Sequence, residues 1–247
     1  MRRVGLVLTL ATGLLAAPTL AEPLALPSPP GARQIAVVVD RGVHHTNQLP
    51  RSLRPLRKRM ISGAAMSTAD LRQLAERKDS LAALRLVKRM RAGEMKQTPS
   101  DMAFYAAVAA GAGRKGMLDD MIDALYRLNP ETEPKDRVSH YIRVLYGHAW
   151  AGNALAQDAL IALNGEGRLF GPMSDATRDR IVAEGGPRMT LSLAINDLAR
   201  DDLDAAGLAR VRGYLDHVAR QDDLALRTMA RALMAQTGAR PSARAVQ

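Results

Sequence analysis

Residues 151–167 read AGNALAQDALIALNGEG and residues 79–93 read DSLAALRLVKRMRAG, and these two stretches decide the fold. Each has a helix-capping residue, Asn153 or Asp79, followed by alanine three positions later, leucine seven later and glycine fourteen later. Steps of three and four residues stay on one face of a helix. The two stretches therefore predict amphipathic helices that bury the same face.

The same spacing of apolar residues recurs three more times along the chain. The further copies start at Lys115, Arg188 and Asp222, so the five starting points lie 36, 38, 35 and 34 residues apart. A period in the thirties is typical of stacked helical hairpins, none of which can bury its apolar face alone. We therefore predict an all-α chain, a right-handed α-solenoid of about five helix-turn-helix repeats over residues 67–238.

The repeat resembles the Sel-one-like repeats, which are relatives of the tetratricopeptide repeat. The matching features are the Gly-Asn start at Gly152, the alanine and leucine steps, and the closing glycines. The other three copies lose the small residues, and the family's tyrosine survives only as Tyr126. The resemblance implies a curved solenoid used for protein–protein interaction, with no shared catalytic residue. It also places Ala82 and Ala156 where neighbouring helices approach most closely.

Capping residues, glycines and prolines predict the helix boundaries. Ser67 and Thr98 are expected helix starts, and Gly93 is expected to end a helix in the left-handed conformation. No run of alternating residues after position 60 favours a sheet. The first helix begins near Ser67, and further helices are expected at 80–92, 102–110, 116–128, 135–151, 154–164, 175–184, 188–200, 204–219 and 222–236.

The first 21 residues have the pattern of a bacterial secretory signal peptide. Arg2 and Arg3 precede an apolar run from Val4 to Ala17, and small residues surround the expected cleavage after Ala21. A transmembrane anchor is the alternative, but the apolar run is shorter than the roughly 20 residues of a membrane span. We expect a periplasmic or secreted protein. The chain has no cysteine, so its stability has to come from helix packing.

Residues 22–66 are rich in proline and arginine and predict an extended basic arm. Gln34–Val39 is expected to form one short strand lying against the first helices, while residues 239–247 form a flexible tail. We expect a mobile arm that contacts anionic lipid headgroups or an acidic envelope protein rather than nucleic acid. The alternative is an arm neutralised by acidic groups of its own helical body. The expected contact residues are Arg54, Arg57, Lys58 and Arg59.

No residue pattern in the chain favours catalysis, a metal ion or a cofactor. Three acid pairs, Asp119-Asp120, Asp201-Asp202 and Asp222-Asp223, stand near helix starts, where carboxylates cap free amides. His140 and His148 are eight residues apart, which is not a zinc-ligand spacing. Motifs for a serine nucleophile or a phosphate loop do not occur. We therefore expect a non-enzymatic protein.

Six of the eight aromatic residues lie between positions 104 and 150. They are interpreted either as core residues or as anchors for a peptide in a concave groove, and Tyr105 and Trp150 are the candidate anchors. The leading hypothesis is an exported adaptor or scaffold that binds a protein or peptide partner. The alternative is an accessory of a peptidoglycan hydrolase, or a degenerate superhelix of the kind that accompanies such an enzyme.

Overall fold

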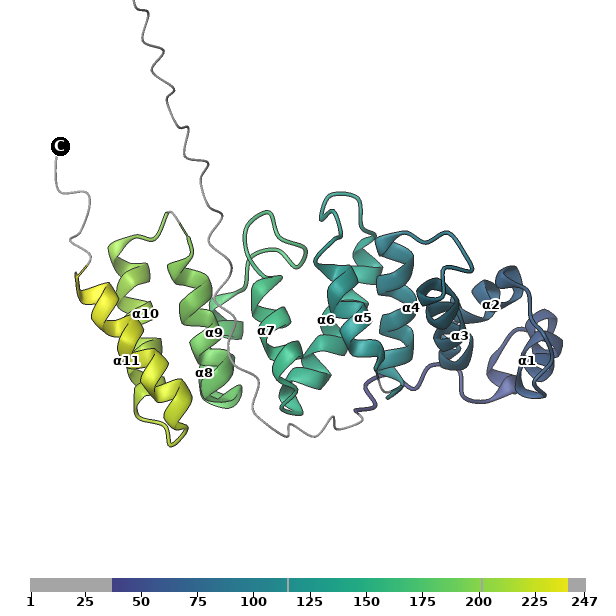
Figure 1. The fold of residues 1–247 in the computed structure, drawn as a ribbon, viewed down its shortest axis with the longest axis horizontal. Coiled ribbons are helices and arrows are strands. Elements are labelled where there is room, and N and C mark those ends of the chain that lie inside the picture. Colours follow the sequence, from purple (N-terminus) through teal and green to yellow (C-terminus); the bar gives the residue numbers. More distant parts are fainter. Residues whose placement is uncertain (1–36, 115, 201, 240–247) are drawn as a thin grey trace, which may run out of the picture.

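The computed structural model describes residues 37–114, 116–200 and 202–239, and this part of the chain is all-helical. The helices follow one another along the long axis of the molecule, from α1 at one end to α11 at the other (Figure 1). None of the described helices is long and apolar enough to cross a membrane. Two 3-10 turns, η1 (Thr46–Gln48) and η2 (Arg51–Leu53), precede α1 (Arg54–Ile61), α2 (Thr68–Ala75), α3 (Ser80–Arg91), α4 (Pro99–Gly111), α5 (Met117–Leu125), α6 (Lys135–Trp150), α7 (Ala154–Ala162), α8 (Asp175–Glu184), α9 (Gly186–Leu198), α10 (Ala205–Ala219) and α11 (Leu224–Ala239).

The helices pack with sequence neighbours and also with helices further along the row. Neighbouring pairs such as α2–α3, α4–α5, α6–α7 and α10–α11 are in contact. Contacts that skip one helix join α4 to α6, α5 to α7, α7 to α9 and α9 to α11. Each hairpin therefore buries its apolar face against the next one, and a single continuous core runs through the helical body.

Side-chain caps explain where the helices begin. Ser67 accepts a hydrogen bond from the amide of Asp70, and Thr98 accepts one from Asp101, as the sequence predicts. Asp79 caps α3, and Asn153 caps α7 in the same way. These oxygens satisfy amides that a helix leaves without intrahelical partners. Of the acid pairs, Asp119 and Asp120 lie in the first turn of α5, and Asp223 caps the amide of Leu226, whereas Asp201 lies outside the described residues.

The repeated alanines are buried as predicted, and the last copy of the repeat is out of phase. Ala82 and Ala156 have no exposed surface. In α11, however, Ala225 is exposed while Leu226 and Ala230 are buried. Asp223, rather than Asp222, provides the cap, so the buried face lies one residue later than expected. The position of the capping residue therefore determines which residues of the helix are buried.

The basic arm is not extended throughout its length. Residues 46–48 and 51–53 form the two 3-10 turns and residues 54–61 form α1, so the prediction of an extended arm is wrong for this part. Pro55 lies in the first turn of α1, where its missing amide costs no hydrogen bond. The helical body accordingly begins at Arg54 rather than at Ser67.

A short extended segment, residues 38–43, packs across the helices, and we call it the strap. Val38 forms an isolated antiparallel bridge with Ala112, and the amides of Val39 and Asp40 donate to the Gly111 carbonyl at 2.8 and 3.0 Å. A Cβ at Gly147 would lie only 2.2 Å from Cγ2 of Val39, so glycine is required there. The expected strand thus docks mainly on α4 and α6 rather than on the first helices, and its residues 34–36 lie outside the described part.

The strap covers a buried histidine. Asp40 of the strap pairs with Lys78 at 3.0 Å, beside the ring of His140, which is 6% exposed. Both ring nitrogens of His140 lack a hydrogen-bond partner within the described residues. Burial, together with the nearby charges of Lys78 and Arg143, lowers the pKa of His140 to about 4, although Asp40 acts in the opposite direction. Burial therefore favours the neutral imidazole, while Asp40 of the strap partly offsets this effect.

Replacing Ala82 or Ala156 by leucine should destabilise the protein by about 1–3 kcal/mol, because these sites have no room for three additional carbon atoms. Ala225→Leu is the matched control, because Ala225 is exposed on α11. Urea unfolding followed by circular dichroism measures the change. Equal stability of Ala156→Leu and Ala225→Leu would contradict the close packing at Ala156.

Acidification should weaken the fold through His140. The pKa of His140 in the folded protein lies below its ordinary value of 6.5. The contribution of the neutral His140 to the free energy of unfolding is therefore complete above pH 6.5 and is lost as the pH falls towards 4. The loss between pH 7.5 and pH 5 should be about 2 kcal/mol. Chemical unfolding of the wild type and of His140→Leu at both pH values isolates this contribution. An unchanged pH dependence in His140→Leu would show that His140 does not titrate in this range.

Candidate functional site

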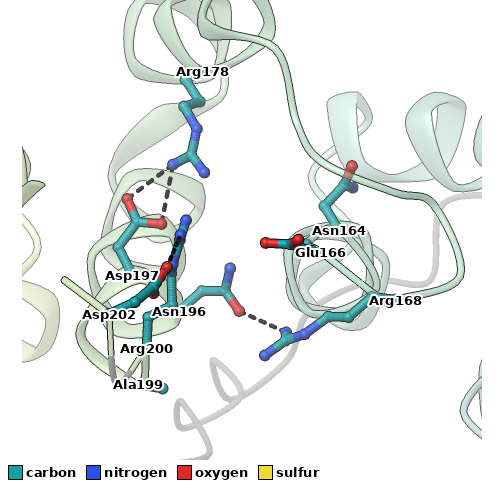
Figure 2. Close-up of a pocket in the computed structure, with 10 residues that line it drawn as sticks. Asn164, Glu166, Arg168, Arg178, Asn196, Asp197, Ala199, Arg200 and Asp202 are labelled. Carbon is teal, nitrogen blue, oxygen red and sulfur yellow. Dashed lines mark hydrogen bonds and ion pairs between the residues drawn. The ribbon is translucent and has the colours of Figure 1, made fainter.

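An open cleft lies between the loop after α7 and the helices α8 and α9 (Figure 2). Its volume is about 430 Å³, and it is open to solvent. Its walls are supplied by the α7–α8 loop, by the first turn of α8 that follows it, and by the C-terminal end of α9. The lining residues are Asn164, Gly165, Glu166, Arg168, Arg178, Asn196, Asp197, Ala199, Arg200 and Asp202.

The α7–α8 loop forms one wall because its backbone folds back on itself. The amide of Gly165 donates to the Gly171 carbonyl at 2.8 Å, and the amide of Phe170 donates to Leu163 at 2.9 Å. Leu169, which is 8% exposed, anchors the loop in the core. The polar residues between these points are thereby held at the rim of the cleft.

A buried ion pair forms the floor of the cleft. Nη1 of Arg178 donates to both carboxylate oxygens of Asp197, at 3.1 and 2.8 Å (Figure 2). The side chains of Arg178 and Asp197 are 12% and 2% exposed. Removing one partner of such a pair leaves the other charge buried without compensation. The pair therefore joins α8 to α9 and fixes the shape of the cleft.

Arg168 links the two walls. Its Nη1 donates to the carbonyl of Ala162 at 2.6 Å and to Oδ1 of Asn196 on α9 at 2.7 Å. At the mouth, Arg200 pairs with Asp202, and both side chains are largely exposed. Glu166 faces the cleft across from α9 and accepts no hydrogen bond from the described residues (Figure 2). Guanidinium, carboxylate and carboxamide groups thus surround one open space.

This chemistry suits recognition of a polar chain. Carboxamides donate and accept hydrogen bonds, as peptide groups do, and the charged groups can pair with side chains of either sign. The lining includes no serine, histidine or lysine, and its ionisable acids are Glu166, Asp197 and Asp202. Within the described part of the chain, no group of three or more His, Asp or Glu residues could hold a metal ion.

Tyr105, one of the two aromatic anchors expected from the sequence, is a core residue. Only 2% of Tyr105 is exposed, and burial raises the pKa of its hydroxyl. The neighbouring Phe104 is only partly buried, and the guanidinium of Arg137 lies 4.4 Å from its ring centroid. One residue along a helix rotates the side chain by about 100°. The choice of Tyr105 is therefore wrong, because the aromatic ring that reaches the surface belongs to Phe104.

Trp150, the other expected anchor, is partly buried at the C-terminal end of α6. Tyr146 stacks on it at 4.9 Å, and the guanidinium of Arg180 on α8 lies 5.4 Å from its ring centroid. Its Nε1 is buried and has no hydrogen-bond partner among the described residues. The ring is thus part of an aromatic and arginine contact between α6 and α8.

The four basic residues expected to contact a partner differ in their surroundings. Arg57 is 8% exposed and donates to Asp79 at 2.6 Å, to Thr46 and to the carbonyl of His44. Arg54 donates to the carbonyls of Leu49 and Asn47. Lys58 and Arg59 are exposed. The choice of Arg57 as a partner contact is therefore wrong, because Asp79 of the helical body neutralises it internally.

Sequence reasoning missed the cleft residues. Arg178 and Asp197 lie 19 residues apart on different helices, and Arg168 and Asn196 lie 28 apart. No motif marks such pairs. Two features of the sequence could have indicated the cleft. One is the seven-residue segment Arg168–Ser174, which separates the end of a repeat at Gly167 from the next helix. The other is Asp197, a charged residue among the mainly apolar buried residues of α9.

Comparisons with protein-family models, with curated proteins and with solved structures found no match to this chain.

Asp197→Asn should destabilise the protein by about 3–5 kcal/mol, because Arg178 would remain buried without a counter-charge. Asp202→Asn, which breaks the exposed pair with Arg200, is the matched control and should change the stability little, because solvent and salt screen an exposed ion pair. Thermal and urea unfolding measure both. Equal losses in the two variants would contradict a structural role for the buried pair.

Proposed function

We propose that this chain is a non-enzymatic adaptor whose helical repeats form an α-solenoid and whose polar cleft binds an extended segment of a partner protein. The observation that carries this proposal is the cleft of about 430 Å³ between α8, α9 and the α7–α8 loop. The buried ion pair of α8 and α9 forms its floor, and the hydrogen bond from Arg168 to α9 links its walls. At its rim, Glu166, Arg200 and Asp202 face solvent.

An extended peptide suits this cleft better than a small apolar ligand does. Asn164 and Asn196 offer donors and acceptors that match a peptide backbone, and charges of both signs alternate around the opening. A preformed site also lowers the entropy cost of binding a flexible segment. The resemblance of residues 79–93 and 152–167 to Sel-one-like repeats supports the same function, because that resemblance implies protein–protein interaction.

We further propose that the adaptor is exported and acts in the periplasm or outside the cell. This rests on the signal-peptide pattern of residues 1–21, which lie outside the described part of the structure. The partner of the cleft is then an envelope or secreted protein. Trp150, with its partly buried ring near α8, is a second candidate contact for such a partner.

Photo-crosslinking in intact cells tests the cleft. A photoreactive phenylalanine analogue at the exposed Ala199 should give a discrete protein adduct, whereas the same analogue at Gln73, exposed on α2, should not give that adduct. Glu166→Gln with Arg200→Gln should reduce the adduct, because the rim of the cleft loses one charge of each sign that can pair with the bound segment. Both residues are exposed, so the thermal stability of the double variant should be unchanged.

Two outcomes would contradict the proposal. One is the same set of adducts from Ala199 and Gln73, which would place the partner elsewhere on the surface or show only random collisions. The other is release of soluble muropeptides from peptidoglycan by the purified protein, which would make the chain an enzyme.

A further inference from the structure

The loop between α1 and α2, at one end of the row of helices, has an apolar and fully exposed tip (Figure 1). Residues 61–65 read Ile-Ser-Gly-Ala-Ala, and every one of them is exposed. Ile61 is 55% exposed, which is unusual for a large apolar side chain, and the following Met66 returns to the core. Gly63 adopts φ of 83°, so the tip turns sharply at a residue that tolerates this conformation.

Three arginines hold this loop by its backbone. Arg59 donates to the carbonyl of Ala65 at 3.4 Å, Arg85 to Met60 at 3.0 Å, and Arg89 to Met66 at 2.7 Å. Arg85 and Arg89 are one helical turn apart on α3, so both face the loop. The apolar tip is therefore held in place by cationic side chains from two helices.

The positive charge around the loop is left almost uncompensated. Lys58 precedes Arg59 on α1 and Lys88 precedes Arg89 on α3, and both lysines are exposed, so the two helices that hold the loop carry five cations in these segments. In the described part of the chain, the only carboxylate within 4.0 Å of these five cations is that of Glu94, which lies 3.9 Å from Arg89. The arginines donate to neutral carbonyls, which satisfy their hydrogen bonds but do not cancel their charge. This end of the molecule therefore has a concentrated positive potential.

We infer that this end of the molecule docks on the surface of an anionic lipid bilayer. Ile61, Ala64 and Ala65 enter the headgroup region, where apolar side chains gain free energy, while the five surrounding cations contact lipid phosphates. Nucleic acid would satisfy the cations equally well but would leave the apolar tip in water. The tip carries no aromatic ring on which a base could stack.

The proposed membrane contact is separate from the cleft. The loop lies beside α1, whereas the cleft lies at α8 and α9, several helices away along the row (Figure 1). Binding at one site therefore leaves the other accessible, and failure of either proposal leaves the other standing.

Co-sedimentation of the full chain with vesicles tests the electrostatic part. The protein should bind vesicles of phosphatidylcholine and phosphatidylglycerol, and bind pure phosphatidylcholine vesicles much more weakly. Lys58→Gln with Arg59→Gln should reduce partitioning to the anionic vesicles roughly 30-fold, because each surface cation contributes about fivefold. The matched control is Lys135→Gln with Arg143→Gln, two exposed residues of α6 with the same change of charge. Residues 1–21 are present in every variant, so their contribution is common to all.

A label at position 61 tests insertion of the tip. The chain has no cysteine, so Ile61→Cys gives a single attachment site for the environment-sensitive NBD fluorophore. Its emission should shift to the blue and increase on anionic vesicles, whereas NBD at Thr228→Cys, exposed on α11, should not change. Raising the salt concentration should reverse the shift, because salt screens the phosphate contacts.

The results of these experiments distinguish membrane binding from nucleic-acid binding and from misfolding of the variant. Equal loss of binding in the two charge variants, or no change of emission at position 61, would overturn the membrane contact. Competition by a short duplex DNA that removes the protein from vesicles, with no blue shift in either complex, would assign the cations to nucleic acid instead. Unchanged thermal unfolding of Lys58→Gln with Arg59→Gln excludes misfolding as the cause of reduced binding.

Discussion

The helices of this chain can stack in a row only because they offer small residues to their neighbours. α4 shows the constraint most clearly, because it contacts α3, α5 and α6 and must therefore be buried on several faces. Of its buried residues, five are alanines and one is Gly111. Small side chains let helix axes approach towards the lower end of the usual 8–10 Å range. The same requirement places Ala82 on α3 and Ala156 on α7, with no exposed surface.

Arginine side chains then connect segments that the helical packing brings together. Arg57 joins α1 to the capping residue of α3, Arg178 joins α8 to α9, and Arg168 joins a loop to α9. Asp79 has two tasks, because one carboxylate oxygen caps α3 and the other accepts from Arg57. A guanidinium has five donors in a planar fork, which suits it to several acceptors at once. These contacts position the chain around the core, and two of them shape the cleft.

The two proposed surfaces differ in how their charges are arranged. Around the cleft, Arg178 and Arg200 are paired with aspartates, so the opening presents both signs and favours polar recognition. Around the loop of residues 61–65, arginines donate to backbone carbonyls, so their positive charge stays available. In the proposed arrangement, the partner segment bound in the cleft is presented near an anionic surface.

The sequence by itself determined the helices α2 to α11, most of their boundaries and the buried alanines, but not α1. These features depend on local physics, since a cap reaches only two or three residues ahead and an amphipathic face repeats within one helix. Even the shifted phase of α11 has a local cause, the cap at Asp223. The tertiary structure alone decided that Arg57 is buried, that Phe104 rather than Tyr105 reaches the surface, and that the cleft exists. These features depend on contacts between residues that lie 19 to 28 positions apart in the sequence, as in the pairs Arg57–Asp79, Arg178–Asp197 and Arg168–Asn196. No local sequence pattern predicts which of such distant residues come into contact.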